Sequence, residues 1–212
     1  MTVALVDYGV GNILSVARAL EAVGADFVRT ADAAVVASAG HVIVPGVGAF
    51  SACMERLAGH GLVDPLRAVS LSGRPMLGIC VGMQMLFERS EEFGGQAGLG
   101  LVPGSVRKLP QQTPSGERSK IPHIGWNALI LPGHGADWAG TPLATTATGT
   151  HFYFLHSFAG YPASDNPLLA CAAYGGREVP AVVRIRNTYG VQFHPEKSGP
   201  AGLELLRRFM SL

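Results

Sequence analysis

The sequence predicts an α/β protein with a central, mostly parallel sheet and helices on both faces. Two observations lead to this class. In the first half of the chain, short apolar runs alternate with segments of helical periodicity, which is the pattern of the strand–helix units that build parallel sheets. In the second half, strand-like runs follow one another closely, which predicts an additional mixed or antiparallel strand region.

The first half should contain three strand–helix pairs. Apolar runs predict strands at 3–6, 41–44 and 76–79, and helical patterns follow at 13–23, 49–57 and 83–90. A ligand would bind at the carboxyl ends of these parallel strands.

The second half should contain mainly strands before one final helix. Strands are expected at 124–131, 151–156, 168–174, 181–185 and 189–193, and the helix at 201–210. Polar segments at 111–120 and 132–137 predict surface loops. Neither loop is long enough to divide the chain, so we expect a single domain over residues 1–212.

Composition and charge exclude several classes of function. With 48% hydrophobic residues, 15% charged residues and a net charge of +1, the chain has no general electrostatic bias toward nucleic acid or anionic membrane. The first apolar run meets Asp7 at once, too soon for a signal peptide or a membrane span, so a cytoplasmic location is expected.

Three other patterns predict that the chain binds no metal ion or dinucleotide and contains no disulfide bond. The three cysteines form an odd set without metal-type spacing, and no pair of the seven histidines has helical ligand spacing within an acidic motif. The glycines of Gly9-Val10-Gly11 are not completed by a third, because Leu14 stands where the dinucleotide fingerprint needs glycine. No cofactor is expected.

Cys80 is a candidate nucleophile. It lies in Gly78-Ile79-Cys80-Val81-Gly82, between a predicted strand and a predicted helix. The partial positive charge at a helix N-terminus favours thiolate over thiol. Gly78 and Gly82 lack Cβ atoms and let the backbones approach around a strained position, as in a nucleophile elbow. The alternative is a small buried cysteine in a turn.

His194 and Glu196 are candidates for the base and its orienting group. The strand-like run 189–193 stops before His194-Pro195-Glu196, and Pro195 favours an extended conformation at His194. Residues two apart in extended backbone point to the same side, so Glu196 can hold the imidazole while it takes the proton of Cys80. The alternative is an ordinary turn at the end of a strand.

These motifs resemble those of class I glutamine amidotransferases. The resemblance rests on 78–84 and 190–198, and three further stretches, 6–12, 122–127 and 152–157, resemble the branch of glutaminase subunits of imidazole glycerol phosphate synthase. It runs from the first strand to the last helix and implies a flavodoxin-like fold and a Cys80-His194-Glu196 triad that hydrolyses glutamine.

Amide hydrolysis also needs donors for the oxyanion. The amide of Val81 and an amide from the loop Pro45-Gly46-Val47-Gly48 form the natural pair; the alternative is that the loop is a plain turn. The resemblance implies that Val47 is the loop donor and that Gly48 frames the substrate. It also implies a loop that is misoriented at rest and corrected when a partner binds.

The resemblance assigns further residues to the substrate. Gln84 and Glu92 would lie near the amino-acid moiety of glutamine, and Tyr153, His156 and Ser157 would line the opposite wall. Gln84 and Glu92 are eight residues apart, a spacing that aligns side chains along a helix but also describes a solvated surface. His156 could instead be a structural histidine.

A partner is implied because the chain has no acceptor domain for the ammonia. By resemblance this partner is the (β/α)₈-barrel cyclase subunit, which forms imidazole glycerol phosphate and aminoimidazole carboxamide ribotide in histidine biosynthesis. Asn12, Trp126 and Lys197 would lie at or near the interface of the heterodimer. Trp126 could instead be a core aromatic, and Asn12 a helix cap.

Two other functions remain open from the sequence. The glutaminase subunit of pyridoxal phosphate synthase belongs to a branch with Gly-Gly-Glu-Ser at the oxyanion loop, whereas this chain has Pro45-Gly46-Val47-Gly48. A non-catalytic regulatory module on the same fold should have lost part of the triad, whereas all three residues are present.

Overall fold

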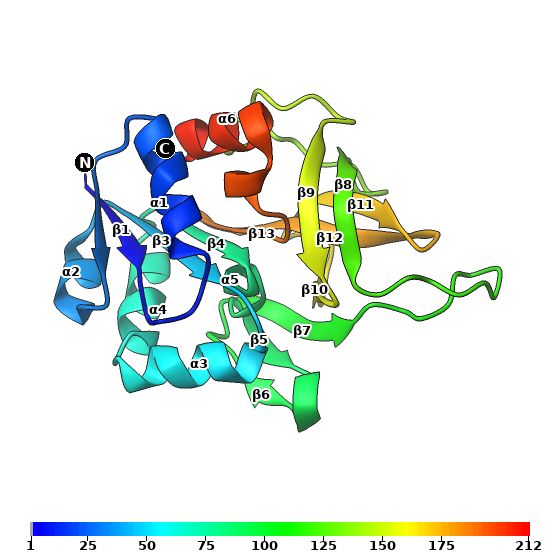
Figure 1. The fold of residues 1–212 in the computed structure, drawn as a ribbon, viewed down its shortest axis with the longest axis horizontal. Coiled ribbons are helices and arrows are strands. Elements are labelled where there is room, and N and C mark those ends of the chain that lie inside the picture. Colours follow the sequence, from blue (N-terminus) through cyan, green and yellow to red (C-terminus); the bar gives the residue numbers. More distant parts are fainter. Residues whose placement is uncertain (1) are drawn as a thin grey trace.

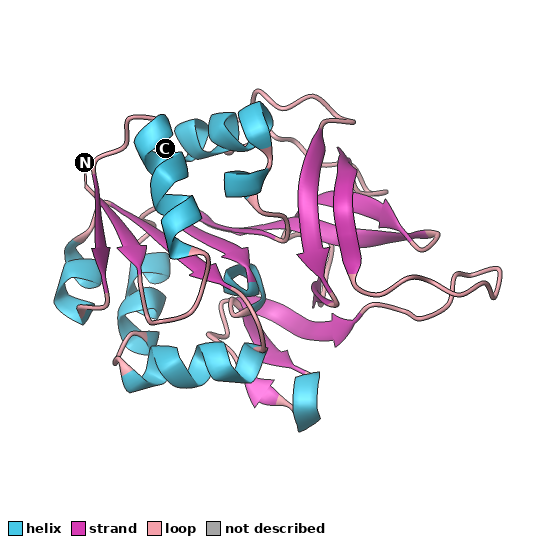
Figure 2. Cartoon of the chain, viewed as in Figure 1, coloured by secondary structure: helices cyan, strands magenta, loops and turns pink. Residues whose placement is uncertain are grey.

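A nine-stranded sheet crosses the molecule in the order β2-β1-β3-β4-β13-β12-β11-β8-β9 (Figures 1 and 2). The computed structural model describes residues 2–212. Five neighbouring strands are parallel: β2 (Phe27–Thr30), β1 (Val3–Val6), β3 (His41–Gly46), β4 (Met76–Cys80) and β13 (Thr188–Val191). Four antiparallel strands extend them: β12 (Arg177–Ile185), β11 (Leu168–Tyr174), β8 (His123–Ile130) and β9 (His151–His156). The predicted α/β class, with its antiparallel extension, is confirmed.

Helices cover both faces of the parallel half. Within residues 2–212 the helices are α1 (Ile13–Ala22), α2 (Ala33–Ser38), α3 (Phe50–Gly59), α4 (Val63–Leu71), α5 (Val81–Gln84) and α6 (Gly199–Phe209). Helices α1 and α6 lie together on one face, whereas α3 and α4 lie on the other (Figure 1). The buried residues of α6, Gly202, Leu205, Leu206 and Phe209, recur at helical spacing, so one stripe of the helix packs on the sheet.

A second, four-stranded sheet flanks the carboxyl end of β4. Its order is β10-β7-β5-β6, with β10 (Phe158–Pro162), β7 (Val102–Lys108), β5 (Phe87–Ser90) and β6 (Gln96–Ala97). Two short 3₁₀ turns complete the fold, η1 (Glu92–Gly94) and η2 (Pro195–Lys197). A single large hydrophobic cluster includes residues from both halves of the main sheet.

The predicted helix over 83–90 is wrong. Helix α5 ends at Gln84, and Phe87 begins strand β5, which pairs in parallel with β7. The ring of Phe87 fills the place that a Cβ would take on Gly160 of β10, so this side chain is fixed by the second sheet. A short buried apolar run does not distinguish helix from strand, and here tertiary packing decided.

Several elements lie between those that the sequence predicts, including β6, β7 and β10 of the second sheet. Strand β2 is partly exposed at the edge of the sheet, and helices α2 and α4 occupy segments without a strong pattern. Within residues 2–212, none of the helices combines the length and apolar character that crossing a membrane requires.

Candidate active site

Cys80 sits at the sharp turn that joins β4 to α5. Its φ is +56°, a left-handed conformation that non-glycine residues rarely adopt. A Cβ on Gly82 would overlap the carbonyl oxygen of Val44 on β3, and one on Gly78 would overlap the backbone of Gly82. Only glycine fits at these two positions, and the strained, glycine-flanked turn that the sequence predicts is present.

His194 and Glu196 are joined directly beside this turn. His194 follows β13, the neighbour of β4, and its Nδ1 donates a hydrogen bond to Glu196 Oε1 at 2.8 Å. His194 has the extended conformation expected before Pro195. The predicted extended path through Glu196 is wrong, however, because residues from Pro195 onward form η2. A 3₁₀ turn, rather than the alternation of a strand, returns the carboxylate to the imidazole.

The electrostatics of His194 favour its charged form. Burial by itself lowers the pKa of His194, but interaction with Cys80 and Glu196 outweighs burial and raises the pKa to about 10. The Nε2 atom of His194 has no hydrogen-bond partner within residues 2–212, and the thiol of Cys80 donates instead to the carbonyl of Leu155 at 3.9 Å.

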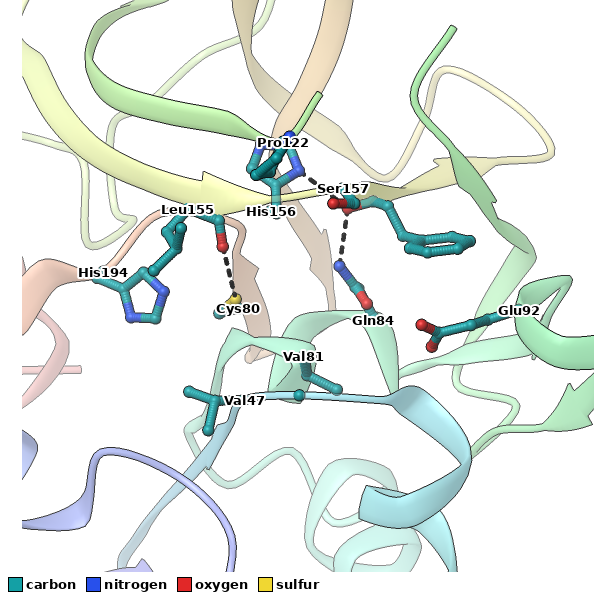
Figure 3. A pocket seen from close by; sticks show the side chains of 12 residues that line it. Val47, Cys80, Val81, Gln84, Glu92, Pro122, Leu155, His156, Ser157 and His194 are labelled. Carbon is teal, nitrogen blue, oxygen red and sulfur yellow. Dashed lines mark hydrogen bonds between the residues drawn. The ribbon is translucent and has the colours of Figure 1, made fainter. Parts of the chain in front are cut away.

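A cavity of about 320 Å³ opens over Cys80. Nine of the predicted site residues line it: Val47, Gly48, Cys80, Val81, Gln84, Glu92, His156, Ser157 and His194. Cys80 and His194 lie toward one end of it and Glu92 toward the other (Figure 3). The loop that carries Val47 faces Val81 because β3 and β4 pair in parallel, with Gly46 opposite Cys80.

Two side chains hold the carbonyls of that loop. The hydroxyl of Tyr8 donates to the carbonyl of Pro45 at 2.7 Å, and the thiol of Cys53 donates to the carbonyl of Val47 at 3.5 Å. Burial raises the pKa of both groups, so both stay protonated as donors at neutral pH. Sequence reasoning assigned neither residue.

Gln84 and Glu92 share the cavity but not a helix, which corrects the suggested helix-face alignment. Gln84 is the last residue of α5, and its amide nitrogen donates to the carbonyl of Phe158 at 2.9 Å. Glu92 opens η1, and its carboxylate accepts from the amide of Phe50 at 2.8 Å, the first residue of α3. Glu92 thus supplies the cap that α3 lacks from its own sequence.

The opposite wall agrees with the sequence prediction only in part. His156 and Ser157 line the cavity, but both ring nitrogens of His156 are engaged, with His123 at 3.1 Å and the carbonyl of Phe158 at 2.9 Å. Burial lowers the pKa of His156 to about 3, so it is neutral. Tyr153 is not among the lining residues, which corrects its predicted placement.

Tyr153 instead belongs to an exposed face at the edge of the main sheet. It pairs with Trp126 across β8 and β9, and Ile124 pairs with Leu155 two residues along, so all four side chains share one face. Trp126 is 56% exposed, and Ile124 is 54% exposed. The alternative of a core aromatic at Trp126 is therefore wrong. We call these four residues the edge face.

The other two residues predicted at the interface lie on different elements, Lys197 in η2 and Asn12 before α1. The ammonium of Lys197 lies 5.9 Å from the centre of the Tyr153 ring, at the border of the edge face. Asn12 precedes α1, but its side chain makes no capping hydrogen bond, which removes support for the cap alternative. Within residues 2–212, no group of three or more histidine, cysteine or acidic residues could hold a metal ion.

A further buried residue at the site was also missed. Gln192 is fully buried just beyond β13 and donates to the sulfur of Cys80 at 3.7 Å. A signal was available, because an uncharged polar residue inside the apolar run 189–193 is unusual for a buried strand.

The fold, the cysteine turn and the paired His194 and Glu196 together define a class of protein. The chain matches the class-I glutamine amidotransferase family over residues 4–212, and it belongs to that family. It is 42% identical to the imidazole glycerol phosphate synthase subunit HisH 1 of Legionella pneumophila (strain Lens), over 100% of this chain and 99% of the relative. The HisH subunit of Geobacillus thermodenitrificans is 41% identical, over 99% of this chain and 95% of that one. A crystal structure of a glutamine amidotransferase, 19% identical, matches the fold with a TM-score of 0.72 over 99% of this chain and 97% of that one.

Proposed function

We propose that this chain is the glutaminase subunit of an imidazole glycerol phosphate synthase. The observation that carries the proposal is that Cys80 and His194 line one cavity, with Glu196 hydrogen-bonded to His194 at 2.8 Å. Identities of 41% and 42% over nearly the whole chain to HisH subunits support the choice of this branch. All three triad residues are present, which argues against a regulatory module.

The residues have the following roles in the proposed reaction. Cys80, as thiolate, attacks the side-chain amide carbon of glutamine, and the backbone amides of Val47 and Val81 stabilise the oxyanion. His194, oriented by Glu196, protonates the departing nitrogen, which leaves as ammonia and gives a γ-glutamyl thioester. His194 then takes a proton from water, which hydrolyses the thioester to glutamate and restores Cys80.

Glutamine would lie with its amide over Cys80 and its amino-acid end toward Glu92. The carboxylate of Glu92 suits the α-ammonium group, and the amide oxygen of Gln84 is left to accept from the substrate because its nitrogen is engaged by Phe158. Gly48 and Ser157 complete the proposed walls of this end of the site.

The ammonia must pass directly to a partner, because in water it would be protonated and lost as a nucleophile. We assign this partner as the cyclase subunit, which would dock on the edge face. Leu155 belongs both to that face and to the lining of the cavity, so the exposed apolar surface reaches the site itself. Trp126 and Lys197 would contact the partner there, and Asn12 would lie near its border.

The test compares two nitrogen sources in the assembled complex with the cyclase. Cys80→Ala should abolish synthesis from glutamine while synthesis from an added ammonium salt survives, because only the glutaminase step needs the thiol. Cys171→Ala, which removes a buried thiol from β11, is the matched control and should use both nitrogen sources. Glutamine use by the Cys80→Ala complex would overturn the assignment.

A further inference from the structure

A chain of buried hydrogen bonds runs behind the cavity and ends on the sulfur of Cys80. The side-chain amide of Gln84 donates to the carbonyl of Phe158 at 2.9 Å and to the amide oxygen of Gln192 at 3.1 Å. Gln192 in turn donates to the Cys80 sulfur at 3.7 Å. Gln84 and Gln192 are both buried, so these contacts do not compete with bulk water.

The orientation of each amide follows from chemistry. The carbonyl of Phe158 can only accept, so the atom of Gln84 that faces it must be the nitrogen. That nitrogen also faces Gln192, whose contacting atom must therefore be its oxygen. The remaining atom of Gln192, the one that faces Cys80, is then the nitrogen, a donor.

A second arm of the hydrogen-bond network, from Asn127 through two histidines, also ends on the carbonyl of Phe158. The amide nitrogen of Asn127 donates to the carbonyl of Ala173 at 2.8 Å and lies 3.3 Å from Nε2 of His123, which must accept. His123 then donates from Nδ1 to His156, and His156 donates from Nδ1 to the carbonyl of Phe158. The two arms meet at one carbonyl with consistent donors and acceptors throughout. The direction of the Gln192 amide is thus set by the fold.

We propose that Gln192 stabilises the thiolate of Cys80 by donating a hydrogen bond to its sulfur, and that Gln84 holds Gln192 in the orientation that does so. The inference rests on the proposed function, because it assigns a role in the same reaction. A donor to sulfur favours the thiolate before attack and again when the thioester collapses and sulfur leaves. The carbonyl of Leu155, which only accepts, cannot supply this interaction.

A glutamine is the side chain that meets both demands. Its amide oxygen accepts a hydrogen bond from Gln84 while its amide nitrogen donates one to Cys80. A glutamate carboxylate can accept but cannot donate, and a methionine has no donor to offer Cys80. The titratable groups around Cys80 are His194 beyond β13, which Glu196 holds, Tyr8 after β1 and Cys53 on α3, with Glu92 of η1 and His156 of β9 lining the same cavity. All of them stay unchanged in a Gln192 variant.

The test measures how fast iodoacetamide alkylates Cys80 in the full chain as a function of pH, with the modified peptide identified by mass. Cys53 and Cys171 are buried and their pKa values are raised, so they should react far more slowly. Gln192→Glu should move the midpoint of alkylation upward by about one pH unit, a tenfold slower reaction at neutral pH. Gln192→Met should move it in the same direction by less, because it removes the donor without adding charge.

Gln112→Glu, an exposed change of the same chemistry, is the control and should react like the parent. If Gln192→Glu does not fold by circular dichroism, Gln192→Met decides. A folded Gln192→Met with the parent's midpoint would overturn the inference, and a raised midpoint would support it. Alkylation needs neither glutamine nor the cyclase, so failure here leaves the Cys80→Ala test of the proposed function unaffected.

Discussion

The two backbone segments that face each other at the candidate active site differ in how tightly the protein holds them. At the nucleophile turn, Gly78 and Gly82 lie against neighbouring backbone and leave no room for a Cβ. At the oxyanion loop, Gly48 has a φ of +85° with open space around it, and the side chain of Val47 is exposed. Packing therefore fixes the backbone of the nucleophile turn, whereas much less fixes the outer end of the oxyanion loop.

The difference suggests where control of the reaction lies. The oxyanion loop is held at the carbonyls that Tyr8 and Cys53 contact and at Gly46, which packs against the nucleophile turn, whereas a Cβ added at Gly48 would meet open space. A partner docked on the edge face would lie beside the cavity, because Leu155 belongs to both. We expect such a partner to act on the loop and not on the nucleophile turn, because only the loop has space in which to move.

The largest expected effect is at the crowded turn. Gly82→Ala should cost about 4 kcal/mol or more of the free energy of unfolding, or prevent folding, because the new Cβ would overlap the backbone of β3, which cannot yield. Urea denaturation measures this cost. A Gly82→Ala protein of nearly parental stability would contradict the claim that packing fixes the turn.

Removing the charge beside His194 should mainly affect activity. Glu196→Gln keeps the shape but withdraws the carboxylate that orients the imidazole, so the glutaminase rate of the complex should fall by about 10²- to 10⁴-fold. Synthesis from ammonium salt should be unchanged. Glu117→Gln, an exposed change in the loop 111–120, is the control and should keep the parental rate.

The same variant carries a prediction for the pH dependence of stability. The pKa of His194 is about 10 in the folded chain, above the value of about 6.5 expected in an unfolded one. Protonated His194 therefore stabilises the fold fully below about pH 6.5, and this contribution is lost as the pH rises toward 10. Cys80 and Glu196 both raise the pKa of His194, and Glu196→Gln removes the part due to Glu196. The difference in free energy of unfolding between the parent and Glu196→Gln should therefore be largest near pH 6 and shrink toward pH 10. An increase in this difference in stability from pH 6 to pH 10 would contradict the prediction.

A smaller effect on stability is expected at the open loop. Gly48→Ala should cost only about 1–2 kcal/mol, because alanine fits the space but disfavours the positive φ. Its effect on the glutaminase rate should exceed this modest loss of stability, since the change biases the loop that carries Val47. A Gly48→Ala protein as unstable as Gly82→Ala would remove the contrast between the two segments.

The smallest effect is expected beneath the loop. Tyr8→Phe deletes the hydroxyl that donates to the carbonyl of Pro45 and should cost about 1 kcal/mol in thermal or urea unfolding. If the hydroxyl also aligns the loop, the glutaminase rate of the complex should fall while its rate with ammonium salt stays constant. Equal losses with both nitrogen sources would assign Tyr8 a structural role alone.

The sequence anticipated what depends on neighbours along the chain. Cys80 between two glycines and His194 before Pro195 are local patterns, so their turn and extended conformations follow from residue type. The helix expected after Cys80 fails at Phe87, because the second sheet that receives this ring is assembled from segments distant in sequence. A short apolar run does not indicate which distant strand it will pair with.

Residues whose roles depend on pairing between strands were also missed or misplaced. Tyr153 points to the edge face and not into the cavity, because the pairing of β9 with β8 sets which side each residue takes. Gln192 meets Gln84 only because β13 and β4 are neighbours in the sheet, although the two residues are far apart in sequence. No local pattern specifies these contacts.

The most direct measurement is the rate of glutamate release by the purified chain, alone and with purified cyclase subunit and its substrate. Because the nucleophile turn is already fixed and the oxyanion loop is not, we expect the isolated chain to release glutamate slowly. The cyclase and its substrate should strongly increase this rate. Stimulation only by a pyridoxal phosphate synthase would move the chain to the other branch. A rate that is the same with and without every partner would contradict the account.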